Sequence, residues 1–365
     1  MALVAMGCDL ATFALDPKPR FDETWNLPAP STKISVADLL PSGGIVSIYS
    51  TPASNPPDSS AFRLTISPAS ISVGVGANCA PCLPLNGTNA IKPPFTLAAS
   101  NSTPLPTDVV SAAILSGSLV VSLTNNMSFD PLFVKTGVGA QGFMVIVVRS
   151  GSLVLGRDSV QGAATPVGPN QTTWAPAPAA GSVLTRAISL SSGTVVTSLT
   201  VDVTIDSPVG DHLVLINTSG QMNATATANN ILVGSVSMNV TNKSMNSGGA
   251  DSVNLTDVTG DAIQSLGLQM TFINPFAVTG SLTVKLAYGP GVTQNITKAI
   301  TLPSGNGQRS ITLNAVEIQS LLGKTSSLSF TGSVNSVAPI AVTPKQAVSI
   351  DNRIVVAVRT SSGGK

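Results

Sequence analysis

The sequence predicts an all-β protein built from tandem antiparallel β-sandwich domains, and three observations carry this prediction. Segments in which apolar and polar residues alternate recur along the chain, separated by clusters of Gly, Pro, Asn and Ser. Apolar residues make up 43% of the chain but aromatic residues only 4%, so the cores must be built from aliphatic side chains, of which Val and Ile prefer pleated strands. No strand–helix–strand alternation appears, which argues against a parallel nucleotide-binding sheet.

Six segments show the alternation most clearly. Short strands with a period of two residues, bounded by turn residues, are typical of sandwich domains. The chain is therefore expected to form several such strands in each domain. The six segments are residues 118–124, 142–148, 199–205, 231–238, 282–286 and 354–358.

One helical signal is clear. Asn314 stands at the N-cap position and Glu317 follows three residues later, which is a capping box. Leu313 and Ile318 flank the cap as a hydrophobic staple, and Gly323 supplies a stop. The sequence predicts one short capped helix near residues 315–322.

An internal repeat indicates two modules of similar design. Residues 119–130 align with residues 268–279, and each segment has an alternating strand, an asparagine (Asn125 or Asn274), a small turn with Phe, and a further strand. The predicted division has four consecutive parts. They are residues 1–30, a signal-like remnant and tether; 31–108, an N-terminal β region; 109–250, a middle β-sandwich; and 251–365, a C-terminal β-sandwich.

The scarcity of charge argues against catalysis. Only 10% of the residues are charged, against about 25% in an average soluble domain, and enzymes need titratable groups placed in pairs. The net charge is +1 with scattered Lys and Arg, so no nucleic-acid partner is expected. Because so little charge leaves little colloidal repulsion, we expect the chain to be glycan-coated, anchored or self-associated.

The acidic residues and the single histidine do not suggest an active site. His212 follows Asp211, and in an extended strand the two side chains would point to opposite faces. Asp202 and Asp206 would lie on one face of one strand, where we interpret them as solvated positions rather than a glycosidase pair. We therefore predict no catalytic residue.

The first cysteine suggests export. Cys8 follows an apolar stretch and Gly7, as at the end of a bacterial lipoprotein signal peptide, and a Pro-rich segment follows over residues 16–20. This pattern predicts that Cys8 is lipidated. The stretch is short and lacks a basic region, so the alternative is that Cys8 is a buried small apolar residue.

The other two cysteines form a C-x-x-C motif, Cys79 and Cys82. A zinc site would need two further ligands, and a redox motif would begin a helix after a strand, whereas this one lies among Asn, Pro and Gly. We predict a structural disulfide that pins a loop, in an oxidising compartment.

One polar segment and two tryptophans are candidates for binding. Asp251, Asn254, Asp257 and Asp261 offer oxygen ligands for a structural Ca²⁺ in a loop, although their spacing is not that of an EF-hand and the alternative is a polar linker. No other cofactor is predicted. An exposed tryptophan can stack on a sugar or anchor a partner, and a buried one is the commoner case; the two are Trp25 and Trp174.

The last third of the chain resembles the type-2 late-embryogenesis-abundant (LEA14 or WHy) family. The motifs are a strand ending in Asn274-Pro275, a strand over residues 282–289, a Leu-Pro strand over residues 300–305, and a strand over residues 328–334. The resemblance implies a seven-stranded Ig-like sandwich without a catalytic centre, of a kind found in bacterial exported lipoproteins. Residues 195–219 resemble, over a shorter stretch, the non-catalytic P-domain jelly roll beside subtilisin-type proteases.

Together these observations predict an exported, non-enzymatic protein of the bacterial cell surface, made of tandem Ig-like sandwiches. Its expected role is structural or self-assembling, with a second copy of the chain as partner. The alternative is a carbohydrate- or lipid-binding sandwich module, lipid-anchored at Cys8, that uses loops at one end of a sandwich and binds an envelope lipid or glycan.

Overall fold

The structure is a computed structural model whose strands and helices confirm the all-β fold class, with 67% strand and 6% helix. The chain divides into two compact units. Unit 1 comprises Met1–Ile34, Ser244–Val334 and Ala347–Lys365, and unit 2 comprises Ser35–Lys243 and Asn335–Gln346. The described residues are 20–36, 39–40, 46–50, 61–66, 69–135, 141–163, 170–174, 182–247, 251–255, 263–289 and 294–361.

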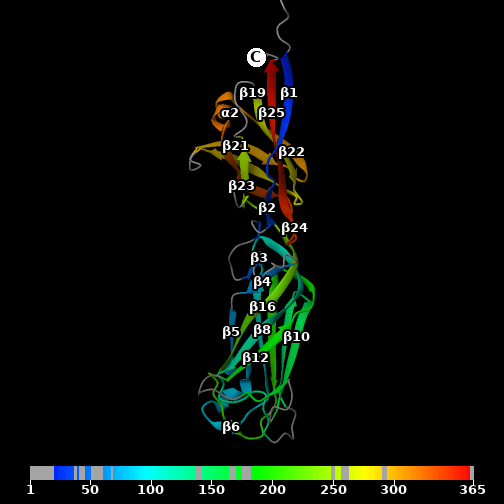
Figure 1. Cartoon of the computed structure of the whole chain (residues 1–365). Coiled ribbons are helices and arrows are strands. Elements are labelled where there is room, and N and C mark those ends of the chain that lie inside the picture. The colour runs from blue at the N-terminus through cyan, green and yellow to red at the C-terminus, as the bar shows by residue number, and fades with distance from the viewer. Residues whose placement is uncertain are drawn as a thin grey trace, which may run out of the picture. The chain divides into compact units, whose positions relative to one another are not determined.

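Unit 1 contains two β-sheets and the helix α2 (Figure 1). The first sheet has the order β1-β25-β19-β22, with β2 also paired to β25, and the second has the order β17-β23-β20-β21, with β18 also paired to β23. The strands are β1 (Arg20–Pro28), β2 (Thr32–Ser35), β17 (Lys243–Asn246), β18 (Asp251–Asn254), β19 (Ile263–Ile273), β20 (Val278–Tyr288), β21 (Gln294–Leu302), β22 (Gly307–Leu313), β23 (Thr325–Ser336) and β25 (Ala347–Ser361).

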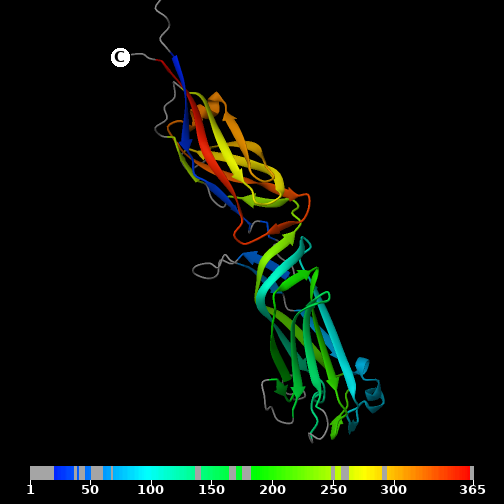
Figure 2. The ribbon, with the colours of Figure 1, turned by 90° about the vertical axis from the view of Figure 1, so that its right-hand side faces the viewer.

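Unit 2 is also built on two sheets, and in Figure 2 its strands form two layers. One contains the run β5-β16-β8-β12 and the other the run β7-β14-β9-β10. These strands are β5 (Ala69–Gly74), β7 (Phe95–Pro104), β8 (Val109–Asn125), β9 (Phe143–Ser150), β10 (Leu153–Gly162), β12 (Ser182–Ser189), β14 (Ser198–Ser207) and β16 (Gln221–Met238).

Shorter elements complete unit 2. The strands β4 and β24 pair with β16, β3 pairs with β4, β13 pairs with β8, and β11 pairs with β10, while β6 and β15 form a separate two-stranded ribbon. Their bounds are β3 (Val46–Ser50), β4 (Phe62–Ile66), α1 (Val75–Asn78), η2 (Ala80–Leu85), β6 (Asn89–Ile91), β11 (Gln171–Thr172), β13 (Gly193–Val196), β15 (Leu213–Leu215) and β24 (Ile340–Val342).

The two units share one topology. When their eight main strands are numbered in chain order, with β17 and β18 counted as one, both units have sheets of order 1-8-3-6 and 2-7-4-5. This is the order of a jelly roll, a double sheet made of two Greek keys. The predicted all-β class with antiparallel sheets is confirmed, and the strand order refines it, because an immunoglobulin sandwich would pair its first strand with its second.

The units are nested along the chain rather than consecutive, because a jelly roll pairs its first strand with its last. Residues 20–28, predicted to belong to a tether, form β1, which pairs antiparallel with β25 from Arg20↔Ser361 to Pro28↔Arg353. That part of the predicted division is wrong. The main body of unit 2 therefore lies, in sequence, between the first and second strands of unit 1.

A buried asparagine closes the same turn in both units, at the aligned positions of the sequence repeat. Asn125 ends the third strand of unit 2 and Asn274 directly follows that of unit 1, and they are 0% and 3% exposed. In each, Oδ1 accepts a hydrogen bond from the backbone N–H two residues on, at 3.0 Å for Asn125 and 3.1 Å for Asn274. Each Nδ2 donates to the carbonyl four residues on, at 3.0 Å. The two modules thus have the same local device where the chain passes to the fourth strand.

The predicted helix is confirmed as α2 (Ala315–Leu321). The N–H of Glu317 donates to the Asn314 side chain at 2.9 Å, and the N–H of Asn314 donates to Oε2 of Glu317 at 2.8 Å, which completes the capping box. Gly323 has a φ of +69°, a left-handed conformation that suits glycine after a helix.

The buried asparagines give a stability prediction. Replacing either by alanine leaves backbone groups unpaired in the interior, so we expect a loss of about 2 kcal/mol in the free energy of unfolding. The loss should be larger for Asn274→Ala, because its Nδ2 also donates to Pro303 O at 2.8 Å. Urea titration followed by circular dichroism measures this. The exposed neighbour Asn126→Ala is the control, and equal stability of all three variants would contradict the assigned role.

Candidate functional site

The candidate site lies at one end of unit 2, where short elements replace the long strands. Between β5 and β7 the chain forms α1, η2 and β6, and between β14 and β16 it forms β15. The strands β6 and β15 pair antiparallel, with Leu213 opposite Ile91 and Leu215 opposite Asn89. These two chain segments, which lie more than a hundred residues apart in the sequence, thus form a single ribbon.

The ribbon presents aliphatic side chains to solvent. Residues directly opposite in an antiparallel pair share a face, as do residues two apart on one strand, so Ile91, Leu213 and Leu215 lie on one face. Their exposed fractions are 52%, 67% and 46%, and neither β6 nor β15 contains a charged residue. We call these three residues the apolar ribbon. Val209, 56% exposed, lies nearby, since the next N–H, of Gly210, donates to Lys92 O at 2.7 Å.

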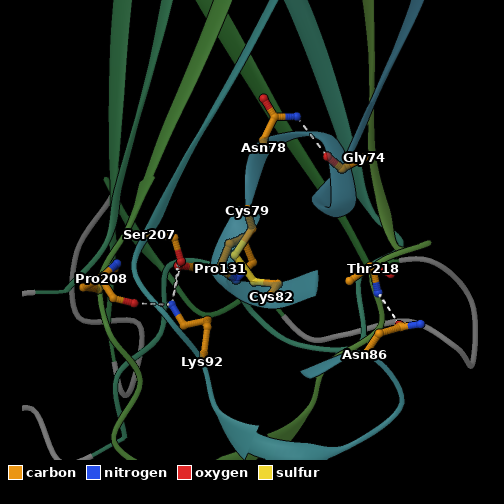
Figure 3. Close-up of a disulfide and its surroundings, with 10 residues drawn as sticks. All are labelled: Gly74, Asn78, Cys79, Cys82, Asn86, Lys92, Pro131, Ser207, Pro208 and Thr218. Atoms are coloured by element: carbon orange, nitrogen blue, oxygen red, sulfur yellow. Dashed lines mark hydrogen bonds between the residues drawn. A yellow bond between two sulfur atoms is a disulfide. The ribbon is translucent and has the colours of Figure 1, made fainter. Parts of the chain in front are cut away.

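A disulfide braces the elements beside the ribbon (Figure 3). Cys79 and Cys82 are bonded to each other, with Cα atoms 5.2 Å apart, and both are fully buried. They join the end of α1 to η2, so the C-x-x-C motif constrains a short helical segment.

Hydrogen bonds also hold this end of unit 2 (Figure 3). Asn78 Nδ2 donates to Gly74 O at 2.9 Å, and the side chain of Asn86 accepts from Thr218 N at 3.0 Å. The backbone N–H of Gly87 donates to the Ile216 carbonyl at 2.8 Å. The bonds of Asn86 and Gly87 fix the segment that leads into β6 to the segment that follows β15.

A buried lysine follows the ribbon directly. Lys92 is 2% exposed, and its Nζ donates to Ser207 Oγ at 2.6 Å, to Pro208 O at 2.8 Å and to Pro131 O at 3.1 Å (Figure 3). The ammonium thus has three acceptors, which come from the end of β14 and the residue after it, and from the loop that follows β8. Lys92 therefore ties the start of β7 to both of these segments.

Burial shifts the pKa values of two groups here. Desolvation lowers the pKa of Lys92 to about 8, although Asp130 and Asp211 oppose the shift. Desolvation raises the pKa of Asp130 to about 6, against hydrogen bonds from the backbone of Leu132 and Trp174 and the charge of Lys92. Both groups therefore bear a cost for being charged near neutral pH.

The two residues beside the ribbon do not lie as predicted. Asp211 and His212 were expected to point to opposite faces of a strand, but the chain bends there, and His212 Nδ1 lies 2.9 Å from Asp211 Oδ1. That prediction is wrong because β15 begins only at Leu213. The carboxylate also accepts from Lys135 N at 2.8 Å, and the imidazole packs edge-on against Phe133. Among the described residues, no hydroxyl is hydrogen-bonded to His212.

The two other acids lie on the outer face of the β7-β14-β9 sheet. Asp202 pairs with Arg149 and accepts from Ser100 Oγ at 2.7 Å. Burial acts to raise the pKa of Asp202, and these hydrogen bonds outweigh it, so its pKa lies below the ordinary value. Asp206 accepts from Thr96 Oγ1 at 3.3 Å.

The predicted calcium loop is wrong for its first half. Asp251 and Asn254 begin and end β18, which pairs with β23, because this segment supplies part of the second strand of the unit 1 jelly roll. Asp257 and Asp261 lie outside the described residues, as does the predicted lipidation site Cys8. Within the described ranges, no group of three or more His, Cys, Asp or Glu residues is placed to hold a metal ion.

The two tryptophans differ. Trp174, in unit 2, is 2% exposed, and its indole N–H donates to Ser182 O at 2.9 Å. Trp25, on β1 of unit 1, is 45% exposed, and its indole N–H donates to Glu23 at 3.2 Å.

Sequence reasoning missed the apolar ribbon. The sequence shows Leu213-Val-Leu215 only as a short apolar run, and such a run is usually buried. Exposure of Ile91 and Leu213 follows from the ribbon lying apart from both main sheets, which no local pattern indicates.

Among the described residues, no helix is long and apolar enough to cross a membrane.

Comparison with known proteins gives distant structural likenesses. No family model and no curated protein matches the chain. A crystal structure of a "putative secreted protein" from Parabacteroides distasonis is similar over 94% of this chain and 100% of its own, with 10% identity and a TM-score of 0.28. The tandem CBM22-1-CBM22-2 domain of Paenibacillus barcinonensis Xyn10C is similar over 80% and 97%, with 9% identity and a TM-score of 0.18. TM-scores this low carry no argument about function.

The shifted pKa values predict an unusual pH profile for unit 2. Asp130 contributes stability below pH 3.8 that is lost as the pH rises through about 6, and Lys92 contributes stability above pH 10.5 that is lost as the pH falls through about 8. These two groups therefore make unit 2 least stable between about pH 6 and pH 8.

Urea unfolding of the Trp25→Phe protein at a series of pH values measures this, because buried Trp174 then reports on unit 2 alone. Lys92→Met in that background should remove the rise in stability between pH 8 and pH 10.5, while the acid side keeps a fall in stability with rising pH because Asp130 is still buried. An unchanged alkaline slope in this variant would show that Lys92 is not the group responsible.

Proposed function

We propose that this chain is an exported, non-enzymatic protein that attaches reversibly to a lipid surface through the apolar ribbon of unit 2. The observation that carries the proposal is the exposure of Ile91, Leu213 and Leu215 on one face of a braced ribbon. Soluble domains rarely leave contiguous apolar side chains in water, and those that do use them to bind proteins, membranes or other ligands.

The residue types favour lipid over other partners. Protein interfaces are enriched in aromatic residues, Met and Arg, and sugars are bound by aromatic rings together with hydrogen-bonding groups. Among the described residues, the exposed apolar side chains on and directly beside the ribbon are Leu, Ile and Val instead, including Leu83 on η2, which is 54% exposed. Aliphatic side chains without hydrogen-bonding partners suit insertion among acyl chains.

The energetics suit weak, reversible attachment. Transferring a half-exposed Leu or Ile side chain from water into hydrocarbon contributes about 1 kcal/mol, so the ribbon and its neighbours contribute a few kcal/mol together. The disulfide and the hydrogen bonds of Lys92 fix the ribbon beforehand, so little conformational entropy is lost on binding. Since β6 and β15 contain no charged residue, attachment should not need anionic lipid.

A non-enzymatic role agrees with how the acids and the histidine are used. Asp202 is paired with Arg149, and Asp211 joins His212 to the backbone of Lys135. In each case the carboxylate supports the structure around it. That these groups support the structure rather than act in catalysis is part of the proposal.

Flotation with phosphatidylcholine vesicles tests the lipid surface as the partner. The native protein should float with the vesicles at low and high salt alike, and the variant Ile91→Asn/Leu213→Asn should remain in the dense fraction. Val183→Asn is a matched control, because Val183 is 58% exposed on β12 of the same unit. No flotation of the native protein would contradict the proposal, and dimers abolished by the double substitution would identify a second copy of the chain as the partner instead.

A further inference from the structure

A second site of different chemistry lies on an outer sheet face of unit 2 and shares no residue with the apolar ribbon. It is an open pocket of about 530 Å³ over β9, β10 and β11. A volume of this size accommodates a small ligand such as a short oligosaccharide. The side chains that define it are Phe143, Arg157, Ser159, Gln161, Asn170 and Gln171.

The register of the sheet explains why these side chains converge. Phe143 lies directly opposite Gln161, and Val145 directly opposite Ser159, so all four point from the same face. The alternate residues, such as Met144 and Val160 (0% and 2% exposed), fill the core. The pocket thus follows from strand pairing, and its floor is the pleated sheet itself.

Phe143 supplies an aromatic surface. Its side chain is 46% exposed, although burying an aromatic ring is strongly favourable. The strand β14 flanks β9 on the side away from β10, and there Asp206 lies directly opposite Phe143. The carboxylate of Asp206 accepts a hydrogen bond from Thr96. Asp206 does not line the pocket. An exposed aromatic ring can stack on the apolar face of a sugar. The amide and hydroxyl groups beside the ring can then form hydrogen bonds with the hydroxyl groups of the sugar.

Arg157 gives the pocket its charge. Among the described residues, it is the only charged one in the lining and it has no ion pair, whereas Arg149 and Arg186 are paired with Asp202 and Asp158. The carboxylate next to it in sequence, Asp158, is therefore already neutralised. A guanidinium left free in a pocket is suited to a carboxylate, which it binds through two parallel hydrogen bonds.

We infer that this pocket binds an acidic oligosaccharide, with Phe143 stacked on a sugar ring, the amides on hydroxyl groups, and Arg157 on a uronate carboxylate. The inference does not depend on the proposed lipid attachment, because it rests on other residues. The two sites together would let one molecule contact a lipid surface and an acidic glycan.

Calorimetric titration with fragments of polygalacturonate, alginate and hyaluronan tests the inference, each in its acid form and as the methyl ester. We expect at least one acid form to bind, its ester to bind about tenfold more weakly, and Arg157→Gln to remove that difference. Phe143→Ala should weaken binding of both forms.

Arg353→Gln is the matched control, because Arg353 is exposed on β25 of unit 1 and has no ion pair among the described residues. Equal binding of acid and ester, or equal loss in the Arg157 and Arg353 variants, would overturn the inference. Absence of binding to all three polymers would also overturn it, as would equal binding of polyglutamate that does not depend on Phe143, which would indicate an acidic peptide.

Discussion

The pairing of the first strand of each unit with its last is the constraint on which the rest of the structure depends. In unit 1 it joins β1 to β25, where Asp22 and Arg359 form an ion pair across 337 residues of chain. In each unit the 1-8-3-6 sheet cannot be completed before the final strand is in place. Such non-local pairing is slow to form because a long loop must close first. It also explains why the unit containing the chain's first described strand encloses the other unit in sequence.

The repeated asparagine shows how two modules with little common sequence maintain one topology. Asn125 and Asn274 each satisfy a backbone donor and a backbone acceptor inside the protein, where an unpaired group would cost free energy. Apolar side chains can exchange for one another in the surrounding core, whereas this pair of hydrogen bonds needs a short amide at one position. The two modules therefore have the same residue at the position where the hydrogen-bond geometry allows the least variation.

Unit 2 has two surface features that the stability of its fold does not require. The apolar ribbon stands apart from both main sheets on loops fixed by Cys79–Cys82 and Lys92, and the Phe143 pocket lies on a rigid sheet face. One offers only aliphatic contact, and the other offers an aromatic ring, amides and a free guanidinium. Their chemistry is different enough for two unlike ligands, and neither site requires the fold to change.

The sequence by itself determined the local features. The capping box around α2, the strand periodicity, and the alignment of Asn125 with Asn274 are set by neighbouring residues, and each could be predicted. Only the tertiary structure decided that residues 20–28 pair with β25, that Asp211 and His212 meet at a bend, and that the side chains of Leu213 and Arg157 face solvent. These depend on which strands become neighbours, and contacts across hundreds of residues leave no periodic signal in the chain.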